Sequence, residues 1–147
     1  MRSKADCSNI KKQFSRSRNS EIAKKRNSEI GFNDEFRERT KQFALRVIKL
    51  FRSLPNNEEA RIIGKQLLRS ACSVGANFRA ATRARSNAEF YSKLSIVVEE
   101  ADESAFWVEL LMASGIVSQT KLESLYNESI EITTITAVSR KTARIKK

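Results

Sequence analysis

The sequence predicts an all-α fold, an antiparallel up-and-down four-helix bundle that carries a disordered basic N-terminal arm. The 147 residues include only four glycines and one proline, fewer than a turn-rich sheet protein needs. Apolar side chains also recur in four separate segments at alternating spacings of three and four, the period of a helix with one buried face. Short connections between four such helices make neighbours antiparallel.

The first 31 residues differ from the rest of the chain because they are rich in Ser, Asn, Lys and Arg. Residues 1–30 hold nine Lys or Arg and three acidic residues, and their apolar side chains are too few to offset the entropy lost on ordering. We therefore expect a disordered basic arm over residues 1–31, the four-helix bundle over 32–139 and a basic C-terminal tail over 140–147.

The first two helices of the bundle follow from one apolar stripe each. The first stripe begins after Asn33 and is stopped by Pro55; its members are Phe36, Thr40, Phe43, Val47, Leu50 and Leu54. Asn56 or Asn57 can cap the second helix, which we expect to end between Arg79 and Arg83. The stripe of this helix consists of Ile63, Leu67, Ser70, Val74 and Phe78.

Capping signals delimit the third helix, and a shorter stripe indicates the fourth. Ser86 and Glu89 have the spacing of a capping box, and Gly115 stands where a left-handed C-terminal cap belongs. The stripe between them is Phe90, Leu94, Val97, Ala101, Ser104, Val108 and Leu111. Thr120 and Glu123 offer another capping box. The fourth stripe is Leu122, Leu125, Ser129, Ile132 and Thr136, in a segment whose β-branched residues weaken helix preference.

Charge divides the expected bundle into two halves. Residues 61–93 hold seven basic side chains and one acid, whereas residues 94–131 hold eight acids and one base. The two ends of the chain carry the whole net charge of +11. Complementary halves favour specific docking, and basic ends attract polyanions, although solvated helix faces would produce a similar pattern.

Several kinds of site are not expected. The chain has no histidine, so the Glu-x-x-His pairs of di-iron bundles cannot form, and the carboxylates between Glu99 and Glu109 lack partners on the second helix. We predict no metal site, no cofactor, no catalytic residue and no enzymatic activity. Cys72 is expected to pack in the core, and two isolated cysteines fit a reducing cytoplasm. No segment is apolar enough to span a membrane.

Large apolar side chains on the outer face of the third helix predict a partner. Acidic residues surround these side chains, so the face can dock on the basic face of the second helix of another copy. Such a contact between different patches closes into a ring or runs on as a fibre, and we expect a closed homo-oligomeric ring. A thickened core or a covering tail would also account for it. The expected interface residues are Arg61, Lys65, Glu99, Glu103, Phe106, Trp107 and Leu110.

Basic residues near the junction of the second and third helices, together with the C-terminal tail, form the candidate nucleic-acid site. Arg side chains bind phosphate well, and no exposed aromatic side chains are interleaved for base stacking. Local pairing with Glu89 is an equally good account of the junction. The candidate residues are Arg69, Arg79, Arg83, Arg85, Lys93, Arg140, Lys141 and Arg144.

The block from Gln66 to Leu111 resembles the family of four-helix bundle proteins encoded in intervening sequences of 23S ribosomal RNA. The residues that carry the resemblance are Gln66, Arg69, Ser73, Asn77 and the Ser86-x-x-Glu89-Phe90 start of the third helix. It extends over about residues 34–138. It implies a bundle that assembles as a ring, typically a pentamer, without known catalysis and with a suspected nucleic-acid role.

The family is also similar to the accessory variability protein of diversity-generating retroelements, which binds a reverse transcriptase and nucleic acid. Many members read Asn-Ile-Ala-Glu-Gly where this chain has Asn77 to Ala81, which makes this junction more basic. We therefore expect a ring-forming protein that binds RNA or DNA. The alternative is a protein adaptor, such as an accessory subunit of a reverse transcriptase.

Overall fold

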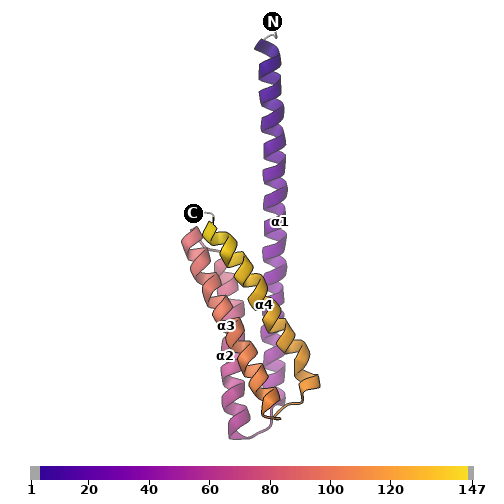
Figure 1. Ribbon diagram of the computed structural model, residues 1–147, viewed down its shortest axis with the longest axis vertical. Coiled ribbons are helices and arrows are strands. Elements are labelled where there is room, and N and C mark those ends of the chain that lie inside the picture. The colour runs from indigo at the N-terminus through magenta and orange to yellow at the C-terminus, as the bar shows by residue number, and fades with distance from the viewer. Residues whose placement is uncertain (1–3, 146–147) are drawn as a thin grey trace. The chain divides into compact units, whose positions relative to one another are not determined.

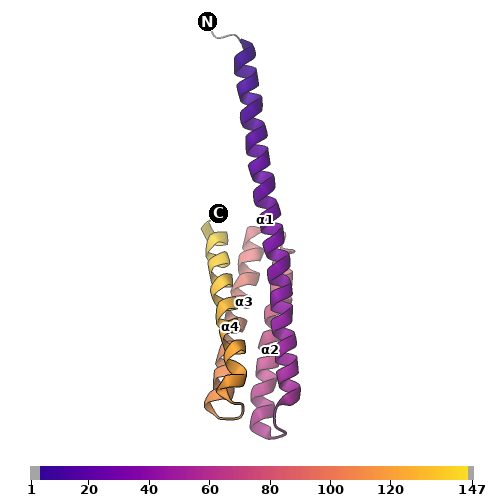
Figure 2. The same cartoon turned by 90° about the vertical axis from the view of Figure 1, so that its right-hand side faces the viewer.

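The computed structural model describes residues 4–145, and the burial of side chains within residues 18–144. The chain forms four helices, α1 (Lys4–Ser53), α2 (Glu58–Ala81), α3 (Asn87–Ala113) and α4 (Gln119–Ile145). Residues 37–147 form one compact unit. In this unit the helices run alternately up and down and pack as a bundle (Figures 1 and 2), as the sequence predicts.

The stripes predicted from the sequence make the core. Phe43, Val47, Leu67, Leu94 and Ile132 are all at most 1% exposed. Polar members of the stripes are buried too, but each buried hydroxyl lies within hydrogen-bonding distance of a carbonyl oxygen in the preceding turn of its own helix, which satisfies it. These hydroxyls belong to Thr40, Ser70, Ser104, Ser129 and Thr136.

The helix ends are close to those predicted. Asn57 accepts a hydrogen bond from Ala60 N at 2.8 Å and caps α2, while Ser86 caps α3 by accepting one from Glu89 N at 3.1 Å. Gly115 follows α3 with a φ of 72°, the left-handed conformation that glycine adopts readily. The predicted cap at Thr120 is displaced, because α4 already begins at Gln119.

Both ends of the chain are helical as far as the structure describes them. The expected disordered arm over residues 1–31 is helical from Lys4 onward, as the first part of α1. Residues 4–30 contain no proline or glycine, and Glu21 can support Lys25 one turn later. The predicted tail over 140–147 is helical to Ile145 as well, and Ala143 within it is buried; residues 146–147 are outside the described part.

Residues 1–36 form a separate unit by contact clustering. Its described side chains from Arg18 to Gly31 are all exposed. Phe32 stacks on Phe36, with ring centroids 5.6 Å apart. From Arg18 to Gly31 this unit is therefore an exposed helix, which presents the apolar side chains of Ile22 and Ile30 among charged and polar groups.

Candidate nucleic-acid interface

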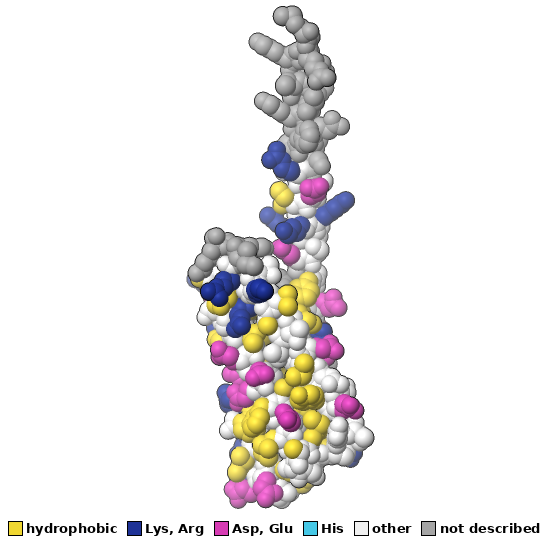
Figure 3. All heavy atoms as spheres, viewed as in Figure 1, with side chains coloured by type: hydrophobic (Ala, Val, Ile, Leu, Met, Phe, Trp, Pro, Cys, Tyr) yellow, Lys and Arg dark blue, Asp and Glu magenta, His cyan; other side chains and the backbone are white. Residues whose placement is uncertain are grey.

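Seven of the eight predicted nucleic-acid-binding residues lie on three segments that meet at one end of the bundle. The end of α2 and the connection to α3 lie beside the end of α4, where the Asn87 side-chain amide donates to the Ala143 carbonyl at 3.0 Å. Figure 3 shows Lys and Arg side chains gathered near this end of the described surface. We call the following seven residues the basic end: Arg79, Arg83, Arg85, Lys93, Arg140, Lys141 and Arg144.

The basic end holds few negative charges. Among residues 79–98 and 132–144 the sequence has a single carboxylate, that of Glu89. One of its oxygens accepts a hydrogen bond from the backbone N–H of Arg85 at 2.9 Å, so this carboxylate is used to cap α3. The sequence left open whether Glu89 pairs with the arginines of the junction. The hydrogen bond of Glu89 in this structure is to the backbone of Arg85.

Apolar and aromatic groups shape this end as well. The Arg140 guanidinium lies over the Tyr91 ring at 6.0 Å from its centroid, a distance at which the ring face attracts a cation. A hollow of about 340 Å³ beside it is lined by Tyr91, Asn87 and Arg144, among others. Sequence reasoning missed Tyr91 and Asn87 because only the tertiary structure brings the end of α4 against the start of α3.

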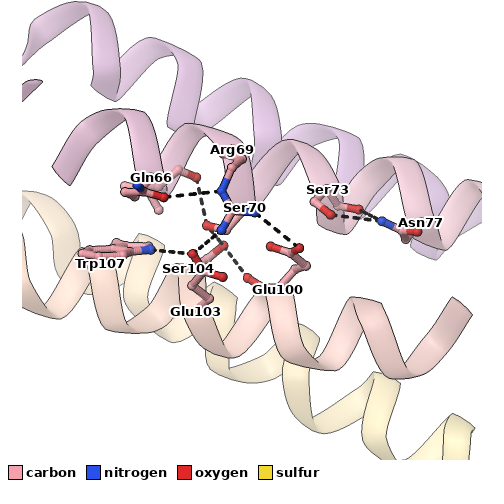
Figure 4. Close-up of polar contacts among 10 residues, drawn as sticks. Gln66, Arg69, Ser70, Ser73, Asn77, Glu100, Glu103, Ser104 and Trp107 are labelled. Atoms are coloured by element: carbon pink, nitrogen blue, oxygen red, sulfur yellow. Dashed lines mark hydrogen bonds and ion pairs between the residues drawn. The ribbon is translucent and has the colours of Figure 1, made fainter. Parts of the chain in front are cut away.

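The eighth predicted residue, Arg69, lies elsewhere, halfway along α2 and facing α3. Its Nη2 donates to Glu103 Oε1 at 2.5 Å, and its Nη1 lies 3.7 Å from Glu100 Oε1 (Figure 4). The guanidinium is thus bound to carboxylates of its own chain. The structure therefore separates Arg69 from the other candidate nucleic-acid residues.

Arg69 belongs to a polar seam between α2 and α3. Trp107 Nε1 donates to the same Glu103 oxygen at 3.0 Å, and the buried Ser104 and Ser70 hydroxyls are hydrogen-bonded at 2.8 Å (Figure 4). The hydrogen bond from Trp107 and the bond and charge of Arg69 hold the pKa of Glu103 below its usual value, against the effect of partial burial. Glu103 thus stays ionised and joins the two helices.

The same seam changes the basis of the predicted ring. The sequence pairs the acidic outer face of the third helix with the basic face of the second helix in another copy, whereas Arg69 and Glu103 meet within one chain. This ion pair within one chain leaves fewer opposite charges on the two helix faces for a contact between copies. Arg61, Lys65 and Glu99 remain exposed, as the ring interface requires.

The apolar part of the predicted interface is only partly open. Phe106 is 52% exposed and packs edge-on against Trp107, with ring centroids 4.8 Å apart. Trp107 and Leu110 are half-buried. Ile62, which the sequence analysis did not single out, is also exposed on α2. Of these three predicted interface side chains, Phe106 therefore has the largest exposed fraction for a partner to cover.

Within residues 4–145, no group of three or more His, Cys, Asp or Glu side chains is placed to hold a metal ion. In the same part of the chain, no helix is long and apolar enough to cross a membrane. Cys72, expected in the core, is exposed, because it lies outside the stripe that faces the other helices.

Comparison with known proteins agrees with the fold. A family model described as 23S rRNA-intervening sequence protein matches residues 33–137. A crystal structure of a protein with unknown function from the S23 ribosomal protein family of Bacteroides thetaiotaomicron is similar, with 35% sequence identity and a TM-score of 0.69. The alignment covers 74% of this chain and 97% of that one. No curated protein matches the chain.

Proposed function

Because the chain belongs to the family of 23S rRNA-intervening sequence proteins, we propose that it is a non-enzymatic, RNA-associated protein. It assembles as a ring of five copies, in keeping with the resemblance, and binds RNA through the basic end. The observation that supports this proposal is that seven cations from the ends of α2 and α4 and the start of α3 gather at one end of the bundle, on segments that contribute one carboxylate, that of Glu89. A ring would repeat this surface around one edge and present it several times to one polyanion.

The character of the basic end favours contact with phosphates over contact with bases. Its cations are Arg and Lys, which bind phosphate oxygens through charge-assisted hydrogen bonds. Tyr91, the aromatic side chain near them, is half-buried and already lies beneath Arg140. Binding of this kind positions RNA without strong sequence selectivity.

Salt dependence tests this proposal. If about five cations contact a single strand, the slope of log K on log salt is about −3.5, and affinity falls about a hundredfold between ~50 and ~200 mM salt. Fluorescence anisotropy of a labelled oligo-uridine RNA measures both. Arg83→Gln/Arg85→Gln should weaken binding and flatten the slope by about 1.4 if both residues contact phosphate.

A control variant must remove the same charge at the other end of the bundle. Lys49 and Lys121 line a separate hollow there, beside Pro55 and Ser118. Lys49→Gln/Lys121→Gln should leave the slope nearly unchanged. Equal effects of the two double variants would mean that only net charge matters, and binding that ignores salt would refute the basic end as an RNA site.

Ring formation has its own test in the mass of the particle in solution. Phe106→Gln removes an exposed aromatic group without adding charge beside Glu103. Light scattering should show an oligomer for the original chain and a smaller particle for the variant, whereas Ile130→Gln on α4, where Ile130 is 40% exposed, should keep the original mass. An original chain that is monomeric would refute the ring.

The alternative function is a protein adaptor, and the exposed Ile62 and Phe106 favour it. An apolar helix face binds a protein partner with little dependence on salt, in contrast to phosphate contacts. A reverse transcriptase is the partner class that the resemblance suggests. An oligomer that binds no RNA at low salt would favour this reading over the first.

A further inference from the structure

A second basic surface lies beside the basic end. A groove of about 610 Å³ runs between α1 and α2, and four cations line it: Arg37, Lys41, Arg79 and Arg83. Arg79 and Arg83 also belong to the basic end, so the two surfaces share side chains and form one continuous basic path. Arg37 and Lys41 were not singled out by the sequence, because the acids Asp34, Glu35 and Glu38 are interspersed with them.

The groove has small side chains between its cations. Ala44, Cys72, Gly75 and Ala76 line it, and α1 and α2 approach closely here, since a Cβ on Gly75 would lie 3.5 Å from the Thr40 carbonyl oxygen. Small residues let a ligand backbone come near the helices. None of the described residues that line the groove is aromatic, so it offers no platform for stacked bases.

One carboxylate, that of Glu38, lines the groove as well. Its two oxygens accept hydrogen bonds from Gln42 Nε2 at 2.8 Å and Lys41 Nζ at 2.9 Å. These bonds hold the pKa of Glu38 below its usual value. The acid is thus ionised and already partnered, and it offsets one of the four positive charges.

We propose that this groove binds the phosphodiester backbone of a single-stranded nucleic acid that continues from the basic end. Packed helix axes are about 8–10 Å apart, so a groove between two of them suits one phosphate chain better than a duplex roughly twice as wide. This inference rests on the proposed function, because the strand would enter past Arg79 and Arg83. It adds Arg37 and Lys41 as phosphate contacts and places Cys72 beneath the bound strand.

The exposed Cys72 thiol gives a direct test. In the full-length Cys7→Ser variant it is the only thiol, and N-ethylmaleimide, a neutral reagent, reports its accessibility. Oligo-uridine RNA at ten times its Kd should slow the modification about tenfold, because only about a tenth of the protein is then free. Single-stranded DNA of equal length tests whether the 2′-hydroxyl is needed, and polyphosphate tests whether a chain of phosphate charges alone suffices.

The outcomes separate the groove from the basic end. RNA that binds by anisotropy but leaves the Cys72 rate unchanged would overturn the groove and leave the proposed function intact. No RNA binding at low salt would overturn both. Protection by polyglutamate but not by RNA would overturn the groove as a nucleic-acid site and indicate an acidic protein segment instead.

Substitutions in the groove give an independent readout that requires no thiol chemistry. Arg37→Gln/Lys41→Gln should flatten the slope of log K on log salt by about 1.4, whereas Lys49→Gln/Lys121→Gln, with the same loss of charge, should not. Circular dichroism checks that each variant keeps its helices. An unchanged slope in a folded Arg37→Gln/Lys41→Gln variant would overturn the proposal.

A single position gives a matched pair if the double variant unfolds. Ala76 is exposed on α2 and lines the groove. Ala76→Glu adds a negative charge there, and Ala76→Gln adds nearly the same volume without charge. The proposal expects Ala76→Glu to weaken RNA binding more than Ala76→Gln at low salt, with the difference shrinking at high salt; equal binding by the two folded variants would contradict it.

Discussion

The ion pair between Arg39 and Glu128 should measurably stabilise the packing of α4 on α1. Arg39 Nε and Nη2 donate to the two oxygens of Glu128 at 2.7 and 2.8 Å, a bidentate geometry. Arg39 also contacts Glu131. The two residues are 89 positions apart in sequence, so the contact directly stabilises the packing of the last helix on the first.

The magnitude follows from geometry and exposure. Two hydrogen bonds to charged groups would contribute about 3–6 kcal/mol in a dry site. The side chains of Arg39 and Glu128 are, however, 31% and 20% exposed. Exposed pairs contribute about 0.2–1 kcal/mol. We expect a coupling free energy of about 1–2 kcal/mol, between the two limits.

The pair should also make stability depend on pH. The hydrogen bond from Arg39 is the main cause that lowers the pKa of Glu128, against the effect of burial. A carboxylate with a lowered pKa stabilises the fold above its unfolded pKa of about 4.3, and this contribution is lost as pH falls through the folded pKa. The coupling should therefore be full at about pH 7 and much smaller at about pH 3.

A double-mutant cycle measures this coupling. Urea denaturation followed by circular dichroism, at one protein concentration, compares the original chain with Arg39→Met, Glu128→Gln and the double variant. Glu131→Gln is the control, since the Glu131 side chain is 62% exposed and its loss should cost little. A coupling near zero at neutral pH, or one that does not fall in acid, would refute the reasoning.

Three further substitutions test a close helix contact, a left-handed backbone position and a helix cap. Gly64→Ala should destabilise the fold by about 1–2 kcal/mol, because its Cβ would lie 2.5 Å from Leu54 Cδ1 and 2.9 Å from Phe51 Cδ2; Gly31→Ala, with nothing within 4 Å, is the control and should raise helicity. Gly115→Ala should cost about 1 kcal/mol, since a φ of 72° disfavours a Cβ. Ser86→Ala should cost about 1 kcal/mol through the loss of the α3 cap. Urea denaturation measures each; an unchanged midpoint for Gly64→Ala, Gly115→Ala or Ser86→Ala would contradict the contact, φ or cap invoked.

Much of the fold could be predicted because its signals are local. Each stripe requires only the helical period, and members such as Phe43, Leu94 and Ile132 are fully buried. The caps at Asn57 and Ser86 depend on side chains within one turn. Residues 4–31, expected to be a disordered arm, are helical, because helix formation depends on backbone propensity as well as on the apolar content that builds a core.

The candidate site was predictable only in part. The sequence identified the cations near Arg79 to Arg85 and in the segment after Ser139, but not that the Asn87 amide reaches the Ala143 carbonyl and joins these segments. It placed Arg69 with them and Cys72 in the core. Arg69 lies earlier on α2, where it contacts Glu103, and Cys72 is exposed. The pattern of one helix does not show which carboxylate an arginine reaches or which side of that helix faces the others.

The sequence by itself determined the helices, their order, the residues of the core and the separation of charge along the chain, because these depend on neighbours within a few turns. Only the tertiary structure decided which charges meet. It brought Arg39 to Glu128 and Arg69 to Glu103, and it placed Arg37 and Lys41 beside Arg79 and Arg83. Such contacts join residues far apart in the chain, so they depend on how the helices pack rather than on the pattern within any one of them.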